Sequence, residues 1–420
     1  MSAPIELVHW TDPDGQAQQA RWRSLAGHAP PKKVQLADDR INADLAYRLV
    51  CEGTGLLWCG DYQNARHLLL ALGRRIDDRE HRASVAAATA AAKASGAPAP
   101  AKRRGKAAPA SPFNRPADPT SPALPAPAQL ALAFHLQRKA QAQRARILGL
   151  LLLPFDADHG VPLRRAPDLR QAGLQAHGPA AEHYVASLRE LQGVVGAFEW
   201  RKNGVPIAAL EASIHPHHGV FSPLRGEYVD LVATTALPTV AHHQGAFDIG
   251  TGSGVLAAVL ARRKLRVTAT DTSPTALACA ADNLQRLDLT AAVKLLQADL
   301  FPPGRAGLVL CNPPWVPAQP SSVLDAAVYD PDSRMLKGFL AGLREHLAPG
   351  GEGWLILSDL AEHLGLRPRS ELMGWIGQAG LTVLGRVDAK PLHARAADKS
   401  DPLHAARAAE TTSLWRLAAG

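Results

Sequence analysis

The stretch Phe247-Asp248-Ile249-Gly250-Thr251-Gly252-Ser253-Gly254 joins a short apolar segment to three alternating glycines. This pattern predicts a strand, a tight turn and the start of a helix whose N-terminal backbone N–H groups face a ligand. A dinucleotide-binding turn has the form G-x-G-x-x-G and would need glycine at position 255, where this chain has Val255. The turn therefore departs from the usual pyrophosphate-binding form.

Acidic residues follow the next two apolar segments of the chain. Asp271 ends the segment 266–270, and an acid at this distance from a glycine-rich turn typically accepts hydrogen bonds from ribose hydroxyls. Asp299 and Leu300 follow the segment 293–296. These positions strengthen the interpretation of the glycine turn as a ligand site.

The tetrapeptide Asn312-Pro313-Pro314-Trp315 follows a fourth apolar segment, 308–311. An amide or exocyclic amino nitrogen is a poor nucleophile because its lone pair is delocalised. The Asn312 side-chain oxygen and the Pro313 carbonyl can each accept one N–H and so aim that lone pair. The two prolines restrict the backbone, and Trp315 can stack on a planar group. The alternative for this segment is a strand that ends in an ordinary proline turn.

The glycine turn and its acids resemble the first motifs of class I S-adenosylmethionine-dependent methyltransferases. The tetrapeptide resembles the (Asn/Asp)-Pro-Pro-aromatic motif of the HemK/RsmC-like group, which methylates planar nitrogen. The resemblance implies S-adenosyl-L-methionine as cofactor, with Asp248 near its methionine end and Asp299 and Leu300 beside its adenine. The implied cofactor-binding residues are Asp248, Gly250, Thr251, Gly252, Ser253, Gly254, Asp271, Asp299, Leu300 and Asn312. The implied catalytic residues are Asn312, Pro313, Pro314 and Trp315.

Residues 213–420 alternate strand-like and helix-like segments, which predicts an α/β domain with a parallel sheet. The resemblance implies a doubly wound, seven-stranded Rossmann-like methyltransferase sheet whose last strand is antiparallel. The segments expected to form its strands are 247–249, 266–270, 293–296, 308–311, 353–357, 381–385 and 412–417.

The N-terminal half matches no family that its motifs identify. Leucines at near-helical spacing predict a mostly helical N-terminal region over residues 1–87. Residues 88–129 are rich in Ala, Pro and Lys and cannot bury enough apolar surface to offset their ordering entropy, so we expect a flexible linker. Residues 130–212 predict a basic helix, a second helix over 180–191, and a β-hairpin that turns at Asn203-Gly204. We interpret 130–212 as a substrate-recognition region.

Two methyl acceptors remain open. A glutamine side-chain amide in a protein of the translation machinery is favoured by Val328-Tyr329-Asp330-Pro331-Asp332, which resembles the HemK group. An exocyclic amine of adenine or guanine in rRNA, tRNA or DNA is favoured by the net charge of +8, by the basic helix and by the polybasic part of the linker, because positive charge suits RNA or a ribosomal particle. A hypothesis of another class is a catalytically retired binding module in ribosome assembly. The intact glycine turn and Asn312 argue against it.

The remaining features indicate a cytoplasmic protein. The chain has four cysteines but no CxxC pair, which fits a reducing compartment. No signal-peptide pattern is visible, and the longest apolar run, 147–153, is shorter than the roughly 20 residues of a membrane span. From the short apolar run we expect no membrane association. His215, His217 and His218 lack Cys or carboxylate partners at ligand spacing, so we also expect no metal site.

Overall fold

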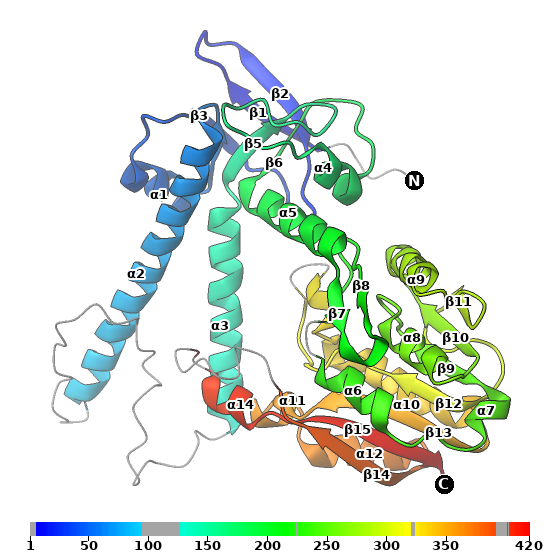
Figure 1. The fold of residues 1–420 in the computed structure, drawn as a ribbon. Coiled ribbons are helices and arrows are strands. Elements are labelled where there is room, and N and C mark those ends of the chain that lie inside the picture. The colour runs from blue at the N-terminus through cyan, green and yellow to red at the C-terminus, as the bar shows by residue number, and fades with distance from the viewer. Residues whose placement is uncertain (1–5, 95–126, 224–225, 321–323, 392–400, 402) are drawn as a thin grey trace. The chain divides into compact units, whose positions relative to one another are not determined.

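The computed structural model describes residues 6–94, 127–223, 226–320, 324–391, 401 and 403–420 (Figure 1). The described chain forms two compact units, each with its own sheet and apolar core. The first unit contains most residues up to Gly196, and the second contains most residues from Ala197 onward. The predicted start of the methyltransferase domain at residue 213 lies within the second unit and stays a prediction.

The second unit is built on a seven-stranded sheet with the strand order β11-β10-β9-β12-β13-β15-β14. Neighbouring strands are parallel except β15, which is antiparallel to both β13 and β14. This confirms the predicted α/β class, the strand number and the antiparallel last strand. The strands are β9 (Ala246–Ile249), β10 (Val267–Asp271), β11 (Val293–Gln297), β12 (Ala306–Cys311), β13 (Leu347–Ser358), β14 (Leu381–Ala389) and β15 (Thr412–Ala419).

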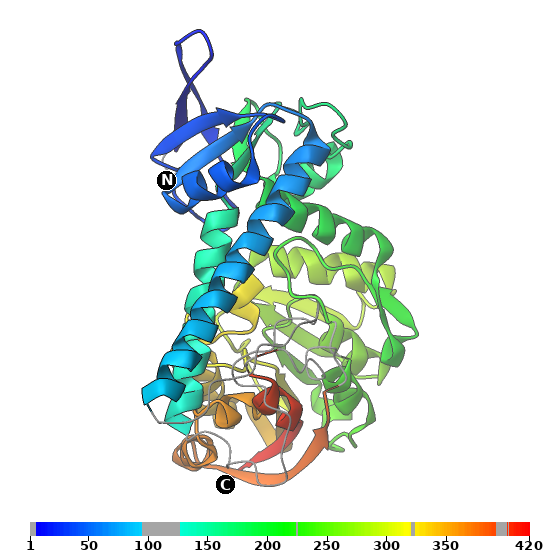
Figure 2. The same ribbon diagram turned by 90° about the vertical axis from the view of Figure 1, so that its left-hand side faces the viewer.

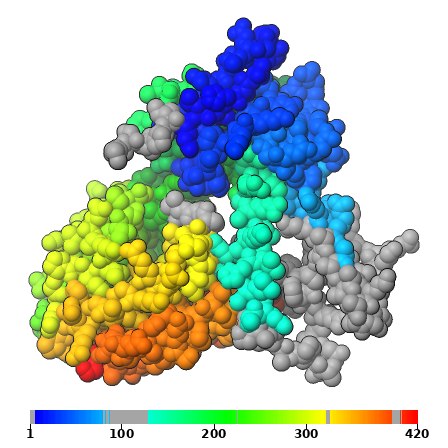
Figure 3. All heavy atoms as spheres, turned by 180° about the vertical axis from the view of Figure 1, so that it is seen from behind, coloured from blue at the N-terminus to red at the C-terminus, as the bar shows by residue number. Residues whose placement is uncertain are grey.

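Helices pack on both faces of this sheet, as the doubly wound prediction requires. Successive strand residues point to opposite faces, so Ala246 and Ile249 of β9 lie in different cores. The core around Ala246 includes residues of α6 (Glu227–Thr234), α8 (Val255–Arg262) and α9 (Pro274–Arg286). The core around Ile249 includes residues of α10 (Arg334–His346) and α12 (Arg369–Gln378). In the space-filling view of Figure 3, the part of the chain coloured yellow to orange, which includes α10 and α12, covers one side of this unit.

Short helices connect the longer elements of the second unit. They are α7 (Ala241–Gln244), η2 (Leu324–Ala327), η3 (Pro331–Ser333), α11 (Leu360–His363) and α14 (His404–Ala409).

The first unit is not mostly helical, contrary to the prediction from its leucines. It contains a mixed six-stranded sheet with the order β1-β2-β6-β5-β4-β3. Leu56 and Leu57 lie in β4 and are buried in different cores. A strand that is buried on both faces reads as a continuous apolar run without alternation, so periodicity does not distinguish it from a buried helix. The strands are β1 (Leu7–Thr11), β2 (Ala17–Trp22), β3 (Lys33–Ala37), β4 (Thr54–Trp58), β5 (Leu151–Phe155) and β6 (Tyr184–Ser187).

Helices α1 (Ala43–Cys51), α2 (Tyr62–Ala94), α3 (Pro127–Leu148) and α4 (Arg170–His177) accompany these strands. The predicted basic helix corresponds to α3. α2 and α3 are the two long helices coloured blue and cyan in Figure 2, and Arg144 Nη1 of α3 donates to the Gly73 carbonyl of α2 at 3.1 Å. The ends of the predicted linker 88–129 belong to α2 and α3, while the rest of it lies outside the described residues.

The hairpin that the sequence predicts, with its turn at Asn203-Gly204, does not form, and a shorter hairpin lies within its predicted second strand, 205–214. α5 (Leu188–Asn203) continues through 197–201, where the sequence predicts the first strand of this hairpin, and it ends before Gly204, whose φ is +75°. β7 (Val205–Ile207) and β8 (Ala212–Ile214) then pair across the 3-10 helix η1 (Ala208–Leu210). A glycine in the left-handed conformation commonly follows the last residue of a helix. Asn203-Gly204 therefore caps a helix instead of reversing a strand.

The helix-capping role of Gly204 gives a testable stability difference. A Cβ at Gly204 would lie 2.7 Å from Ser213 Cβ in addition to the positive φ, so Gly204→Ala is expected to lower the free energy of unfolding by about 1–2 kcal/mol. Gly193→Ala in the same helix meets no atom within 4 Å and should raise it by about 0.5–1 kcal/mol. Urea denaturation followed by circular dichroism measures both. Equal effects of the two substitutions would contradict the cap.

Candidate functional site

Three neighbouring strands carry the predicted site at one edge of the sheet. β10, β9 and β12 are adjacent and parallel. Asp271 ends β10, the glycine turn follows β9, and Asn312 follows β12. Because the carboxyl ends of parallel strands share an edge, the sheet brings the predicted cofactor and acceptor residues together.

The three glycines of the turn have different reasons to be glycine, although all have positive φ. A Cβ on Gly250 would lie 2.5 Å from Met335 Cε, and a Cβ on Gly254 would lie 3.0 Å from Ala280 Cβ. A Cβ on Gly252 would meet no heavy atom within 4 Å, and the φ of Gly252 is +56°. Gly252 therefore leaves open space at the turn, where a ligand can approach the backbone closely.

Asp248 braces this turn from within the core. It is 1% exposed, and its Oδ2 accepts a hydrogen bond of 2.6 Å from the Thr251 hydroxyl. Burial raises the pKa of Asp248 to about 6, while hydrogen bonds from Thr251 and from the backbone of Ala257 act in the opposite direction. The contacts of Asp248 hold the turn in place, so its predicted contribution to cofactor binding stays a prediction.

Asp271 links the glycine turn to the next helix. Its Oδ2 accepts from the Gly252 N–H at 3.0 Å, and its Oδ1 accepts from the Ser273 N–H at 2.9 Å. Ser273 in turn caps α9. A carboxylate has about four lone-pair sites, so acceptor capacity remains for the ribose hydroxyls that the sequence predicts as its ligands.

Asp299 and Leu300 follow β11 in contrasting environments. The Asp299 carboxylate is mostly exposed and lies 3.3 Å from Arg334 Nη2, an ion pair that water screens. Leu300 has a φ of +70°, which is uncommon for a residue with a side chain. Its carbonyl accepts from the Thr270 hydroxyl at 2.6 Å. That bond fixes Leu300 beside the carboxyl end of β10, near Asp271.

Asn312 and Trp315 contact each other directly. The Trp315 indole N–H donates to Asn312 Oδ1 at 2.9 Å. A carbonyl oxygen has two lone pairs, so Asn312 Oδ1 can still accept a second N–H. The Trp315 ring meets the Tyr228 ring edge to face, with centroids 6.4 Å apart. Pro313 is buried, while Pro314 and Trp315 are partly exposed.

Asn283 supports the turn from α9, and the sequence interpretation missed it. It is 1% exposed, its Nδ2 donates to the Ser253 carbonyl at 3.0 Å, and its Oδ1 accepts from the His215 N–H at 2.8 Å. It follows Cys279 at i+4 on the buried face of α9. A polar residue at such a position is a detectable signal, because a buried amide must be hydrogen-bonded.

Arg367 was also missed. It is 2% exposed and its Nη2 donates to the Trp315 carbonyl at 3.2 Å. A single arginine between two short helical segments has no spacing pattern that would have revealed this contact.

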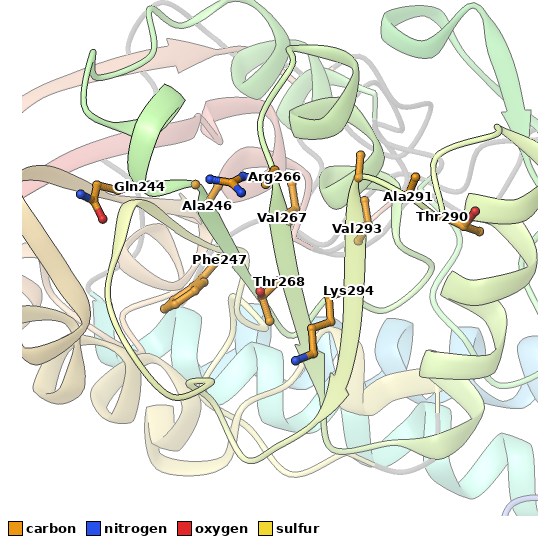
Figure 4. Close-up of a pocket in the computed structure, with 12 residues that line it drawn as sticks. Gln244, Ala246, Phe247, Arg266, Val267, Thr268, Thr290, Ala291, Val293 and Lys294 are labelled. Atoms are coloured by element: carbon orange, nitrogen blue, oxygen red, sulfur yellow. The ribbon is translucent and has the colours of Figure 1, made fainter.

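A hollow lies at the opposite edge of the same sheet, at the amino ends of β9, β10 and β11 (Figure 4). Its lining includes Arg266, Thr268 and Lys294. None of the predicted site residues line it. In Figure 4 the charged ends of Arg266 and Lys294 point in different directions. The hollow therefore does not form a convergent anion site, and it is not where the predicted chemistry lies.

His215 and His217 of the histidine group form hydrogen bonds with neighbouring residues. His217 Nε2 lies 2.7 Å from Asp282 Oδ2, and His215 Nδ1 lies 2.7 Å from the Arg201 carbonyl. Within the described residues, no three His, Cys, Asp or Glu side chains are placed to hold a metal ion. None of the described helices is both long and apolar enough to cross a membrane.

Comparison with known proteins shows what this domain is similar to. Residues 211–368 match the family model of the methyltransferase small domain. The chain is 36% identical over 152 residues to a release factor glutamine methyltransferase from Cereibacter sphaeroides, covering 34% of this chain and 51% of that protein. It is 40% identical over 115 residues to the corresponding protein from Moorella thermoacetica, covering 26% and 41%. The matches therefore span about half the length of these relatives or less.

One solved structure that resembles this protein is that of a ribosomal protein L11 methylase from Lactobacillus delbrueckii subsp. bulgaricus. It is 16% identical, with a TM-score of 0.33, over 49% of this chain and 85% of that one. The second unit is therefore similar in sequence to methyltransferases over residues 211–368, and its strand order agrees with the sheet that the sequence predicts.

Asp248→Asn is expected to change how stability depends on pH. The folded-state pKa of about 6 lies above the unfolded value of 3.8, so the stability that Asp248 contributes is present below pH 3.8 and lost as the pH rises through about 6. The unfolding free energy of the wild type relative to the variant should fall across this window and then level off. Urea denaturation at a series of pH values measures the difference. A difference independent of pH would contradict the raised pKa.

Proposed function

We propose that the second unit transfers a methyl group from S-adenosyl-L-methionine to a glutamine side-chain amide of a release factor or a related protein of the translation machinery. The observation that carries the proposal is the position of Asn312. Its side-chain oxygen lies at the same sheet edge as the glycine turn and retains a lone pair after accepting from Trp315.

The residues present suit the cofactor. Gly252 leaves room for close approach, Asp271 retains acceptor capacity for ribose hydroxyls, and Leu300 offers an apolar contact for a flat base. When bound, S-adenosyl-L-methionine supplies an electrophilic methyl group on a sulfonium centre. These residues would bind and orient it at the end of the sheet where Asn312 also lies.

Asn312 and Pro313 orient the acceptor nitrogen. Their carbonyl oxygens accept the two N–H groups of a primary amide, which turns the face of the nitrogen toward the methyl group. The N–C bond would form as the methyl–sulfur bond of the cofactor breaks and the neutral thioether leaves. The positive charge that develops on the nitrogen would be stabilised by both oxygens. The N–H proton becomes acidic only at that stage and would pass to water, so the site needs no strong base before the transfer.

The segment 328–332, which lies beside the tetrapeptide, favours a protein acceptor over a nucleobase. The Val316 N–H donates to the Val328 carbonyl, and the Asp330 N–H donates to the Val316 carbonyl. The HemK-like stretch 328–332 is therefore held against the residues that follow the tetrapeptide. The relatives named above are release factor glutamine methyltransferases, which supports the same acceptor. Because release factors act on ribosomes, this proposal places the protein in the cytoplasm.

A nucleobase amine is the second candidate, and the net charge of +8 supports it. One arginine of the basic helix does not contribute to this argument. Arg144 is bonded to the Gly73 carbonyl and forms an ion pair with Asp77, so its charge is already used within the protein. The polybasic part of the linker lies outside the described residues.

Asn312→Ala is expected to lower kcat for methylation of a purified bacterial release factor by about 10²–10³-fold, the scale for loss of one orienting polar contact. Its Kd for S-adenosyl-L-methionine, measured by calorimetry, should change little. Asn312→Asp keeps an acceptor oxygen at the same place and should retain more activity than the alanine variant. Turnover is measured with methyl-labelled cofactor, and mass spectrometry locates the modified residue.

The acceptor is tested by digestion and substitution. Label that protease removes, and that disappears when the modified glutamine of the release factor is replaced by asparagine, supports the proposal. Label that RNase removes from a total ribosomal fraction would replace the glutamine acceptor with a nucleobase. Cofactor binding without transfer to either fraction would favour a retired enzyme.

A further inference from the structure

Arg367 is a nearly fully buried arginine that touches the acceptor motif. It is 2% exposed and lies just before α12. Its Nη2 donates to the Trp315 carbonyl at 3.2 Å, and its Nη1 donates to the Ser333 hydroxyl at 3.4 Å. Both partners are neutral. A buried guanidinium is costly unless it is paired, so its presence here calls for a physical explanation.

The carboxylates near Arg367 are engaged with other groups. Glu362 Oε1 lies 2.6 Å from Arg369 Nε. The two Asp330 oxygens accept from the N–H groups of Met335 and Leu336 at 3.1 and 3.2 Å. Burial lowers the pKa of Arg367, and Glu362, Glu371 and Asp330 oppose this only from a distance. Electrostatic pairing therefore does not account for the position of Arg367.

Arg367 connects the acceptor motif to the segment that precedes α10. Trp315 belongs to the tetrapeptide, and Ser333 starts the turn into α10 with a φ of +53°. The bridge between Val316 and Tyr329 joins the same two segments on the other side. The tetrapeptide is thus held by backbone pairing at Val316 and by a side chain at Trp315.

Trp315 in turn contacts Asn312, the residue that orients the acceptor nitrogen. Trp315 accepts from Arg367 through its backbone carbonyl and donates to Asn312 Oδ1 through its indole N–H at 2.9 Å. A donor that occupies one lone pair of Asn312 Oδ1 also fixes the rotation of the amide. The free lone pair then has one direction, which is what an orienting acceptor needs.

We propose that Arg367 is a positioning residue for methyl transfer: it fixes Trp315, whose indole N–H sets the orientation of the Asn312 oxygen that receives the acceptor N–H. This role rests on the proposed function of Asn312. It concerns the orientation of the acceptor and not the affinity for the cofactor, because Arg367 contacts neither the glycine turn nor Asp271. Arginine suits the role since its planar group presents two donors in a fixed geometry, which lysine cannot do.

Two variants and a matched control separate positioning from general stability. Arg367→Lys keeps the charge and removes the fork, and Arg367→Met removes both with similar length. Arg369→Lys is the control, because Arg369 lies two residues further on and pairs with Glu362 but makes none of the hydrogen bonds to the tetrapeptide. Thermal unfolding of each variant verifies folding before any other measurement.

The first readout needs no methyl acceptor. The indole N–H resonance of Trp315 in a ¹⁵N correlation spectrum, assigned by its loss in Trp315→Phe, reports the bond to Asn312. Arg367→Lys should shift or broaden this resonance, while Arg369→Lys should leave it in place. An unshifted Trp315 resonance in both Arg367 variants would overturn the proposal, whatever substrate the enzyme uses.

The second readout uses the release factor assay. Arg367→Lys is expected to lower kcat by about 10-fold, and Arg367→Met by up to about 10²-fold, the scale of a misplaced reacting group. The Kd for S-adenosyl-L-methionine should stay within about 2-fold. In a Trp315→Phe background the effect of Arg367→Lys should shrink, because residues that act through one another are not additive. Full multiplicative loss in the double variant, or a loss equal to that of Arg369→Lys, would contradict the proposal.

Discussion

The parallel pairing of β9 with β12 is the constraint on which the site depends. Its register sets Ile249 opposite Cys311, so Gly250 and Asn312 leave the sheet side by side. Ile249 and Cys311 are both fully buried. A slip of one residue would turn these side chains to the opposite face of a sheet that is covered on both sides. The core that holds this register therefore also holds the cofactor turn next to the acceptor motif.

Buried polar groups give the site its second layer of order. Asp248 holds Thr251, Asn283 holds the Ser253 carbonyl, and Arg367 holds the Trp315 carbonyl. Each one bonds backbone or hydroxyl groups of the two motifs, and each is at most 2% exposed. Polar groups of this kind stabilise a fold only when their bonds are made. Their arrangement thus links a correctly formed site to a correctly packed core, which is how a rigid scaffold keeps acceptor groups oriented.

The sequence predicted the second unit well because its information is local. Short apolar runs between turns identify parallel strands, and both motifs directly follow such runs, so strand order was enough to bring Asp271, Gly252 and Asn312 together. The role of Arg367 was not predictable, since its contact with Trp315 depends on how α12 and the loop before it pack. Asn283 was predictable in principle from its place on the buried face of α9.

The first unit shows where local patterns fail. The leucines at positions 56 and 57 suit a helix as well as a strand buried on both faces, and only pairing with distant segments such as β5 decides between them. The Asn203-Gly204 pair is equally ambiguous, because a glycine with positive φ serves both a hairpin turn and the end of a helix. In both cases non-local packing settles what propensity leaves open.

A crystal structure with S-adenosylhomocysteine and a glutamine-containing release factor peptide would test the central claim most directly. The account predicts that the glutamine amide donates one N–H to Asn312 Oδ1 and one to the Pro313 carbonyl, with its nitrogen facing the cofactor sulfur and the ribose hydroxyls bonded to Asp271. A glutamine amide bound away from Asn312, with the cofactor in the glycine turn, would contradict it.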